Sequence, residues 1–241
     1  MAVTYYDTEQ FYEQPSTEKL QENAEQTLKK ALGKGKKMKP VIVEGRSIAN
    51  SWWGRAWCEN LERYADYESR LERGKRYLRT GTVVDLQIKK GIVSARVQGR
   101  RKSPYKVEIR ISPISEDNLQ RIMGICEKRI ESMDMLLKGK FPEDLRDTFI
   151  GEGGLFPTPK EISFNCSCPD WALMCKHVSA VLYGVGVRFD EDPLLFFTLR
   201  GIEVEHFVDV TLENSVESML RNVDVKSDRI ITGNSWKKLF Q

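Results

Sequence analysis

The sequence contains no apolar run long enough to cross a lipid bilayer. Its longest clearly apolar stretch, VSAVLYGVGV at 178–187, reaches about half of the roughly 20 residues that a membrane-spanning helix needs. The first residues, MAVTYYDTEQ, lack both the basic region and the apolar region of a secretory signal peptide. These absences lead us to expect a cytoplasmic protein without a membrane partner.

Cysteine and histidine are both scarce. The 241 residues include five cysteines and two histidines. An odd cysteine count, with Cys58 and Cys126 isolated in the chain, argues against a disulfide framework and in favour of a reducing compartment. We expect both isolated cysteines to be structural, with Cys126 in the apolar stripe of a helix.

Motifs of common catalytic classes are also missing. The sequence has no P-loop, no G-x-S-x-G, no H-E-x-x-H and no G-x-G-x-x-G. His206 lies in VEHFVDV, where we expect a structural or surface role rather than that of a catalytic base. The protein is therefore expected to be non-enzymatic and to have no small-molecule substrate.

Charge of both signs is present, but it is unevenly distributed. The net charge is only +3, yet residues 26–40 carry six lysines and no acid, and residues 86–107 carry seven basic residues and no acid. Residues 188–221 carry eight acids against three arginines. The basic half therefore suits a phosphate-rich partner, whereas the acidic end suits a protein partner.

A two-residue periodicity predicts three consecutive β-strands. Apolar and polar residues alternate in TVVDLQI, IVSARV and YKVEIRI, with Gly91 and GRRKSP at the turns between them. The pattern is typical of an antiparallel meander with one apolar face and one solvated face. Its solvated face and second turn carry Arg96, Arg100, Arg101, Lys102, Lys106 and Arg110.

Helices are predicted on both sides of the meander. Residues 16–32 predict a polar helix followed by the flexible basic linker GKGKKMKP, an arm that we expect to pack weakly. Ser51 is a suitable N-cap for a helix that contains SWWGRAW. We expect the tryptophans of that helix to be buried, and the alternative is a solvent-facing platform that stacks nucleic-acid bases. A further helix is expected from Ser115, with an apolar stripe that reaches Ile130.

The segment NCSCPDWALMCKH concentrates three cysteines and one histidine in the spacing C-x-C-x6-C-x-H. Residues i and i+2 of an extended segment point to the same side, so Cys166 and Cys168 can face one ion. In a helix, the same spacing separates two side chains by about 200°. Cys175 must therefore lie just before a helix and His177 in its first turn. An apolar stripe begins directly after His177, at Val178, Val181, Leu182 and Val185.

This ligand set predicts one structural Zn²⁺. Three thiolates and an imidazole suit tetrahedral zinc, and four protein ligands fill its coordination shell. A disulfide between Cys166 and Cys168 would close a strained ring and would leave His177 without a role. A Cys–His nucleophile needs an orienting group and would not explain three neighbouring cysteines. An iron–sulfur cluster is the alternative that the ligands leave open.

The spacing, followed by an apolar helix, resembles the SWIM zinc finger, C-x-C-x(n)-C-x-H. The resemblance implies that Cys166, Cys168, Cys175 and His177 are its zinc ligands. SWWGRAW, the segment GTVVDLQIKKGIVSARVQGRRKSPYKVEI and the LFP element at 155–157 are similar to the stand-alone prokaryotic members of that family. The family is regarded as nucleic-acid- or protein-binding, and its prokaryotic members are associated with Swi/Snf-type helicases. The resemblance therefore implies a helicase-like partner.

The expected fold class is α+β: a three-stranded antiparallel meander with flanking helices, a small zinc-stabilised ββα module, and C-terminal helices. Four units are expected. They are the polar helix with its basic arm (1–40), an α+β domain that contains the meander (41–150), the SWIM-type module (151–201) and an acidic helical segment (202–241).

Two functions are compatible with these features. The first is nucleic-acid binding, with DNA as the favoured type and with contacts from Arg96, Arg100, Arg101, Lys102 and Lys106. The alternative is a protein-interaction adaptor. Its support is a helix over LLFFTLR, introduced by Asp192 and Pro193 and apolar on more than one side. We expect that helix to be buried rather than to dock a partner.

Overall fold

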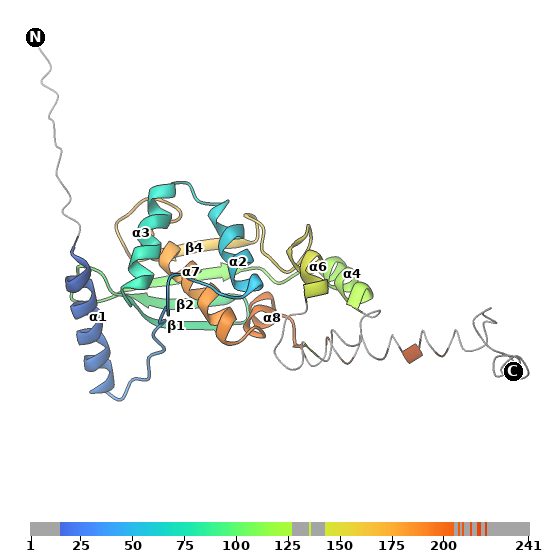
Figure 1. Cartoon of the computed structure of the whole chain (residues 1–241), viewed down its shortest axis with the longest axis horizontal. Coiled ribbons are helices and arrows are strands. Elements are labelled where there is room, and N and C mark those ends of the chain that lie inside the picture. Colours follow the sequence, from blue (N-terminus) through green and yellow to red (C-terminus); the bar gives the residue numbers. More distant parts are fainter. Residues whose placement is uncertain are drawn as a thin grey trace, which may run out of the picture.

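A four-stranded antiparallel sheet forms the centre of the fold, in the order β1-β2-β3-β4 (Figure 1). The strands are β1 (Val83–Lys89), β2 (Ile92–Val97), β3 (Tyr105–Ile111) and β4 (Ile162–Cys166). The structure is a computed structural model. It describes residues 15–126, 135, 143–204, 207, 209, 213, 216, 217 and 220.

Strands β1 to β3 form the predicted meander. Ala95 pairs with Leu86 on one side and Val107 on the other, and all three side chains are buried. The next residue, Arg96, pairs with Asp85 and Lys106 on the solvated face. The two-residue periodicity therefore assigned both the strands and their faces correctly.

Strand β4 extends this sheet. Cys166 pairs with Val107 and Phe164 with Ile109, so the segment that carries the first cysteines aligns antiparallel to β3. The sequence predicted a three-stranded meander and a separate ββα module, and did not include this pairing. The fold class, α+β with helices that flank an antiparallel sheet, is confirmed. The division of the chain into four units stays a prediction.

Helix α7 (Lys176–Glu191) is the central helix. It contacts all four strands, and α2 and α3 pack against it (Figure 1). Every side chain from His177 to Val187 is buried. The other helical elements are α1 (Thr17–Leu32), α2 (Trp52–Glu62), α3 (Glu68–Arg79), α4 (Glu116–Cys126), the 3₁₀ turn η1 (Glu143–Leu145), α6 (Arg146–Ile150) and α8 (Leu195–Arg200).

The helix starts predicted at Ser16, Ser51 and Ser115 are confirmed. The start predicted at Asp192 and Pro193 is wrong, because Leu194 is the N-cap of α8. The Ser16 and Ser51 hydroxyls cap α1 and α2 by accepting hydrogen bonds from the amides of Lys19 and Gly54. Helix α4 begins directly after Ser115. The side chain of Cys126, His206 and most of the acidic segment 202–241 lie outside the described residues.

The expectation that the N-terminal arm packs weakly is wrong. Leu20, Ala24 and Ala31 of α1 are buried, and Thr27 donates a hydrogen bond of 2.8 Å to the Gln98 side chain. The linker that follows is also held. The Lys39 carbonyl accepts a 2.9 Å hydrogen bond from the amide of Leu86, and the Val41 amide donates one of 3.0 Å to Val83. The expectation was wrong because α1 buries only three small or medium apolar residues. In a largely polar helix, so few apolar residues give only a weak sequence signal of packing.

The tryptophan helix faces the core, as expected. Trp52 and Trp57 are buried, and the Trp57 indole donates a 2.9 Å hydrogen bond to the Leu182 carbonyl. The Trp57 ring makes edge contacts with Phe189 and Phe196. These rings are covered by protein, so they do not form a solvent-facing stacking platform.

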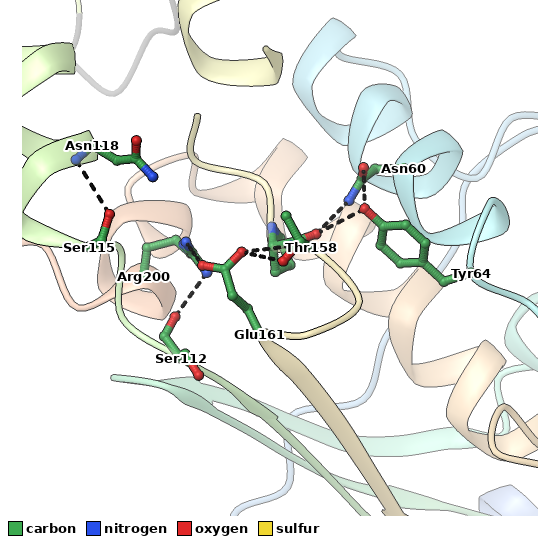
Figure 2. A network of polar contacts seen from close by, with 9 residues as sticks. Asn60, Tyr64, Ser112, Ser115, Asn118, Thr158, Glu161 and Arg200 are labelled. Atoms are coloured by element: carbon green, nitrogen blue, oxygen red, sulfur yellow. Dashed lines mark hydrogen bonds and ion pairs between the residues drawn. The ribbon is translucent and has the colours of Figure 1, made fainter. Parts of the chain in front are cut away.

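A polar network fixes the C-terminal helix α8 to the sheet (Figure 2). Arg200, only 1% exposed, donates to the Ser112 carbonyl at 2.9 Å and to the Glu161 carboxylate at 2.6 Å. Glu161 also accepts hydrogen bonds of 2.8 Å from the amide and the hydroxyl of Thr158. Helix α8 itself is buried through Phe196, Phe197 and Leu199. Its burial confirms the preferred interpretation of LLFFTLR.

The LFP element lies between α6 and β4 in the chain and is hydrogen-bonded to α2. Leu155 and Phe156 are buried, and the Pro157 carbonyl accepts hydrogen bonds from Asn60 at 3.2 Å and Tyr64 at 3.1 Å (Figure 2). Two contacts thus hold this glycine- and proline-rich segment in place. Residues of the α2 region bind the Pro157 carbonyl, and Arg200 of α8 binds the Glu161 carboxylate.

In the part of the chain that the structure describes, no helix combines the length and the apolar character that spanning a membrane requires.

Close contact between α3 and α7 predicts a strong effect of Gly74→Ala. A Cβ at Gly74 would lie 2.6 Å from the Ser179 Cβ and 3.0 Å from the Ala180 backbone nitrogen. Overpacking of this kind costs about 1–3 kcal/mol, which exceeds the gain of about 1 kcal/mol in helix propensity. Urea denaturation should show a less stable protein. Gly124→Ala is the matched control, because no atom lies within 4 Å of its Cβ position, and it should be neutral or stabilising. Equal stability of the two variants would contradict the packing.

Candidate metal centre

The structure brings together the four residues that the spacing singled out. Cys166 ends β4, Cys168 follows in the adjoining loop, Cys175 is the N-cap of α7 and His177 lies in its first turn. One ligand atom from each residue lies within 4.8 Å of the others. The predicted placement of Cys175 before a helix and of His177 inside it is confirmed, and the cluster could hold a metal ion.

The distances inside the cluster fit a four-coordinate ion. The Nδ1 atom of His177 lies 3.8 Å from the sulfur of Cys166 and 4.0 Å from that of Cys175. A tetrahedral ion with metal–sulfur bonds of about 2.3 Å and metal–nitrogen bonds of about 2.0 Å separates neighbouring ligand atoms by roughly 3.6–3.8 Å. These two nitrogen–sulfur distances therefore exceed the spacing around a bound ion by at most a few tenths of an ångström.

Hydrogen bonds within the cluster favour negative charge on one sulfur. Thiol hydrogen bonds from Cys166 and Cys175 strongly lower the pKa of Cys168, while the hydrogen bond to Cys168 raises the pKa of Cys166. Burial lowers the pKa of His177, which keeps its imidazole neutral. A thiolate and a neutral imidazole are the forms that bind metal, and an ion would replace the thiol protons.

Two tyrosines hold the His177 ring in place. Tyr105 stacks on it with ring centroids 4.2 Å apart, and Tyr77 makes an edge contact at 5.4 Å. His177 is 1% exposed, and its Nε2 atom has no hydrogen-bond partner among the described residues. The ring therefore presents Nδ1 to the cluster and leaves Nε2 on the other side.

The loop between Cys168 and Cys175 is anchored to its neighbours. Arg70 of α3 donates a 3.2 Å ion-pair hydrogen bond to Asp170, and Asp66 accepts a 3.1 Å hydrogen bond from the amide of Leu173. On the other side of the cluster, the Lys106 amide bonds to the Ser167 hydroxyl at 2.9 Å. The end of β4, the loop and the start of α7 therefore supply the ligands, and α3 and β3 hold the loop in place.

The basic residues expected to contact nucleic acid occupy two places. Arg96 and Lys106 lie on the solvated face of the sheet, beside the carboxylates of Asp85 and Glu108. The other three lie together in the turn between β2 and β3. They are Arg100, Arg101 and Lys102, all of them exposed. The structure does not combine the five residues into a single patch.

Several polar and aromatic residues near the cluster were not identified from the sequence. They are Tyr67, Arg70, Arg73 and Arg76 of the α3 segment, and Trp171 of the ligand segment. Helix α3 was missed because its twelve residues contain few apolar side chains. Its buried residues Leu71, Gly74, Tyr77 and Leu78 nevertheless follow a helical spacing that could have revealed it.

Comparison with known proteins gives one informative relative. The chain is 39% identical over 161 residues to a Mycobacterium tuberculosis protein named Uncharacterized protein Rv2102. The aligned region covers 66% of this chain and 58% of that protein, so the chain spans less than two thirds of its relative. No family model and no solved structure matches the chain. Membership of the SWIM family therefore stays a prediction from the ligand spacing.

Proposed function

We propose that this chain is a zinc-stabilised, non-enzymatic accessory protein that binds nucleic acid, with DNA as the favoured type. The observation that carries the proposal is the position of the exposed cations Arg100, Arg101 and Lys102 on the β2–β3 turn, where Arg100 lines a cavity together with His177 of the Cys/His cluster. Among the described residues, no carboxylate lies within ion-pair distance of these three side chains. Unpaired surface cations that gather on one turn are suited to contact phosphates.

Zinc is the ion that best fits the cluster. Three sulfur ligands and one imidazole nitrogen are typical of structural zinc, and four protein ligands leave no position for a substrate. Bound there, zinc would supply folding free energy by joining the end of β4 to the start of α7. The N-terminus of α7 and the neighbouring Lys176 would offset the negative charge of three thiolates around a divalent ion.

The solvated face of the sheet should contribute less to phosphate binding than the number of its basic residues suggests. Arg110 is paired with Glu108 at 2.7 Å, and Asp85 lies opposite Arg96. These acids offset much of the positive charge of the sheet face. We therefore assign the main phosphate contacts to Arg100, Arg101 and Lys102, with Arg96 and Lys106 as weaker contributors.

A helicase-like partner remains part of the proposal through the resemblance to SWIM proteins. In the adaptor alternative, the zinc finger and the C-terminal helices dock a partner, and the helix over LLFFTLR was one support for it. The structure buries that helix, α8, against the core, so it has no free apolar face for a partner. The alternative stays a prediction, but that helix no longer supports it.

Neutralising Arg100, Arg101 and Lys102 together tests the proposal. The triple alanine variant should bind DNA more weakly, and the slope of log K against log salt should flatten by about 2–3 because each phosphate contact contributes about 0.9. Fluorescence anisotropy across a salt series measures both quantities. The matched control removes the same charge at Lys19, Lys29 and Arg110, which are exposed and already ion-paired. Unchanged affinity and slope in the first variant would refute the assignment.

A further inference from the structure

Two adjoining cavities lie beside the metal cluster, with volumes of about 40 and 290 Å³. Arg73, Tyr105, Lys176 and His177 line both of them, so the two cavities adjoin, and together they are called the hollow. We call its cationic lining the basic track. It consists of Arg70, Arg73, Arg76, Arg100 and Lys176.

The basic track has a large excess of positive charge. Asp170 is the one carboxylate among the described residues that line the hollow, and it is bound to Arg70. Arg73 and Arg100 have no hydrogen-bond or ion-pair partner within the described ranges. Clustered cations repel one another in a partly desolvated hollow, so an anionic ligand would relieve an unfavourable arrangement.

A buried donor lies at the same place. His177 lines both cavities, and its Nε2 atom is buried without a partner among the described residues. Because Nδ1 faces the cysteine sulfurs, a metal-bound imidazole carries its proton on Nε2. The ring would then offer an N–H donor to an anion in the hollow. This unpartnered polar atom points to a ligand independently of the arginines.

An exposed tryptophan adjoins the other end of the track. Trp171 directly follows Asp170 in the ligand loop and is 78% exposed. Its ring meets the edge of the Tyr67 ring at 5.7 Å, and the hydrogen bonds from Arg70 and Leu173 hold the loop on either side of it. A large aromatic side chain that is both exposed and fixed on a loop is suited to stack on a planar ligand.

From these features we infer that the hollow binds a single strand of nucleic acid, with phosphates along the basic track and a base stacked on Trp171. Cations that follow the backbone and an aromatic side chain that stacks on a base are the two components of single-strand binding. A duplex keeps its bases stacked inside, so it cannot place one on Trp171. This inference rests on the proposed function and specifies the nucleic acid as single-stranded.

The test compares binding of a labelled oligothymidylate, the corresponding oligouridylate and a DNA duplex to full-length protein variants. Wild type should bind the single strands at least about tenfold more tightly than the duplex, and the two oligonucleotides distinguish DNA from RNA. Trp171→Ala should weaken single-strand binding about tenfold, Trp171→Phe should restore most of it, and Arg73→Ala should weaken it severalfold. Zinc content is measured for every variant. Weaker binding by a variant with the zinc content of the wild type then cannot result from loss of the metal.

Two control substitutions lie at exposed residues on the same loop or helix as the tested residues. Leu173 lies in the same loop and is also 78% exposed, but its aliphatic side chain cannot stack on a base. Arg79 is an exposed arginine of α3 that does not line the hollow. Leu173→Ala and Arg79→Ala should both bind like wild type.

The possible outcomes separate this inference from the proposed function. Equal binding of single strand and duplex, with no effect of Trp171→Ala and Arg73→Ala, overturns the single-strand site and leaves nucleic-acid binding in place. No binding of any oligonucleotide overturns both. Tighter binding of polyglutamate than of the oligonucleotides would also overturn the inference, since it would assign the basic track to an acidic protein segment.

Discussion

Cys175→Ser should remove the metal ion and sharply lower the stability of the protein. Cys175 is 1% exposed and caps α7 at the point where this helix meets the end of β4. A serine hydroxyl is a poor replacement for a thiolate at zinc, so the three remaining ligands would hold the ion much more weakly. We expect zinc to fall from about one ion per chain to well below half, with a fall of several degrees in the melting temperature.

Cys58→Ser is the matched control for this experiment. Cys58 lies on α2, away from the cluster, and burial raises the pKa of its thiol to about 12, so it is a protonated packing residue. The substitution should keep the full zinc content and change stability only modestly. Metal analysis and calorimetry on the same samples measure both effects. Full zinc content in Cys175→Ser would contradict the assignment of the fourth ligand.

Arg200→Ala should produce the largest loss of stability outside the metal centre. The substitution leaves the Ser112 carbonyl without its donor and the Glu161 carboxylate without its cation (Figure 2). Arg200 is buried, but the Glu161 side chain is 26% exposed, so the substitution should cost about 2–3 kcal/mol, less than loss of a partner from a fully buried ion pair. Arg110→Ala is the control, since its exposed ion pair should contribute less than about 1 kcal/mol. Similar denaturation midpoints for the two variants would contradict the importance of the buried pair.

The same ion pair predicts part of the pH dependence of stability. Burial opposes ionisation of Glu161, but hydrogen bonds from Thr158 and Arg200 outweigh it and lower the pKa of the carboxyl below its ordinary value of 4.5. The unfolded chain therefore binds the proton first as pH falls. The stabilising contribution is fully present above pH 4.5 and is lost as pH falls through the lower, folded-state pKa. Glu161→Gln should lose this part of the acid dependence.

The local features of the fold could be predicted from the sequence because they leave a local signature. Alternation identified β1 to β3, since one face of each strand is buried and the other is solvated. Ser16 and Ser51 marked helix starts because a hydroxyl at the N-cap satisfies a free backbone amide. The ligand positions followed from the different directions of residues i and i+2 in a strand and in a helix. This geometry required Cys175 to precede α7.

Features that depend on distant parts of the chain could not be predicted in this way. The pairing of Cys166 with Val107 joins segments almost sixty residues apart, and nothing local to either segment encodes it. The same limit applies to the basic track. Arg73, Arg100 and Lys176 come from three separate elements and lie together only because α3, the β2–β3 turn and α7 meet at the metal cluster. Helix α3 was missed altogether, so its arginines could not be considered.

The central claim is that a metal-bound Cys/His cluster supports a basic surface that binds nucleic acid. The most direct measurement is a salt-dependent titration of DNA and RNA, single- and double-stranded, with wild-type protein whose metal content is determined on the same sample. We predict about one zinc per chain and a log K that falls linearly with log salt. One zinc per chain without salt-dependent binding of any of these nucleic acids would contradict the account.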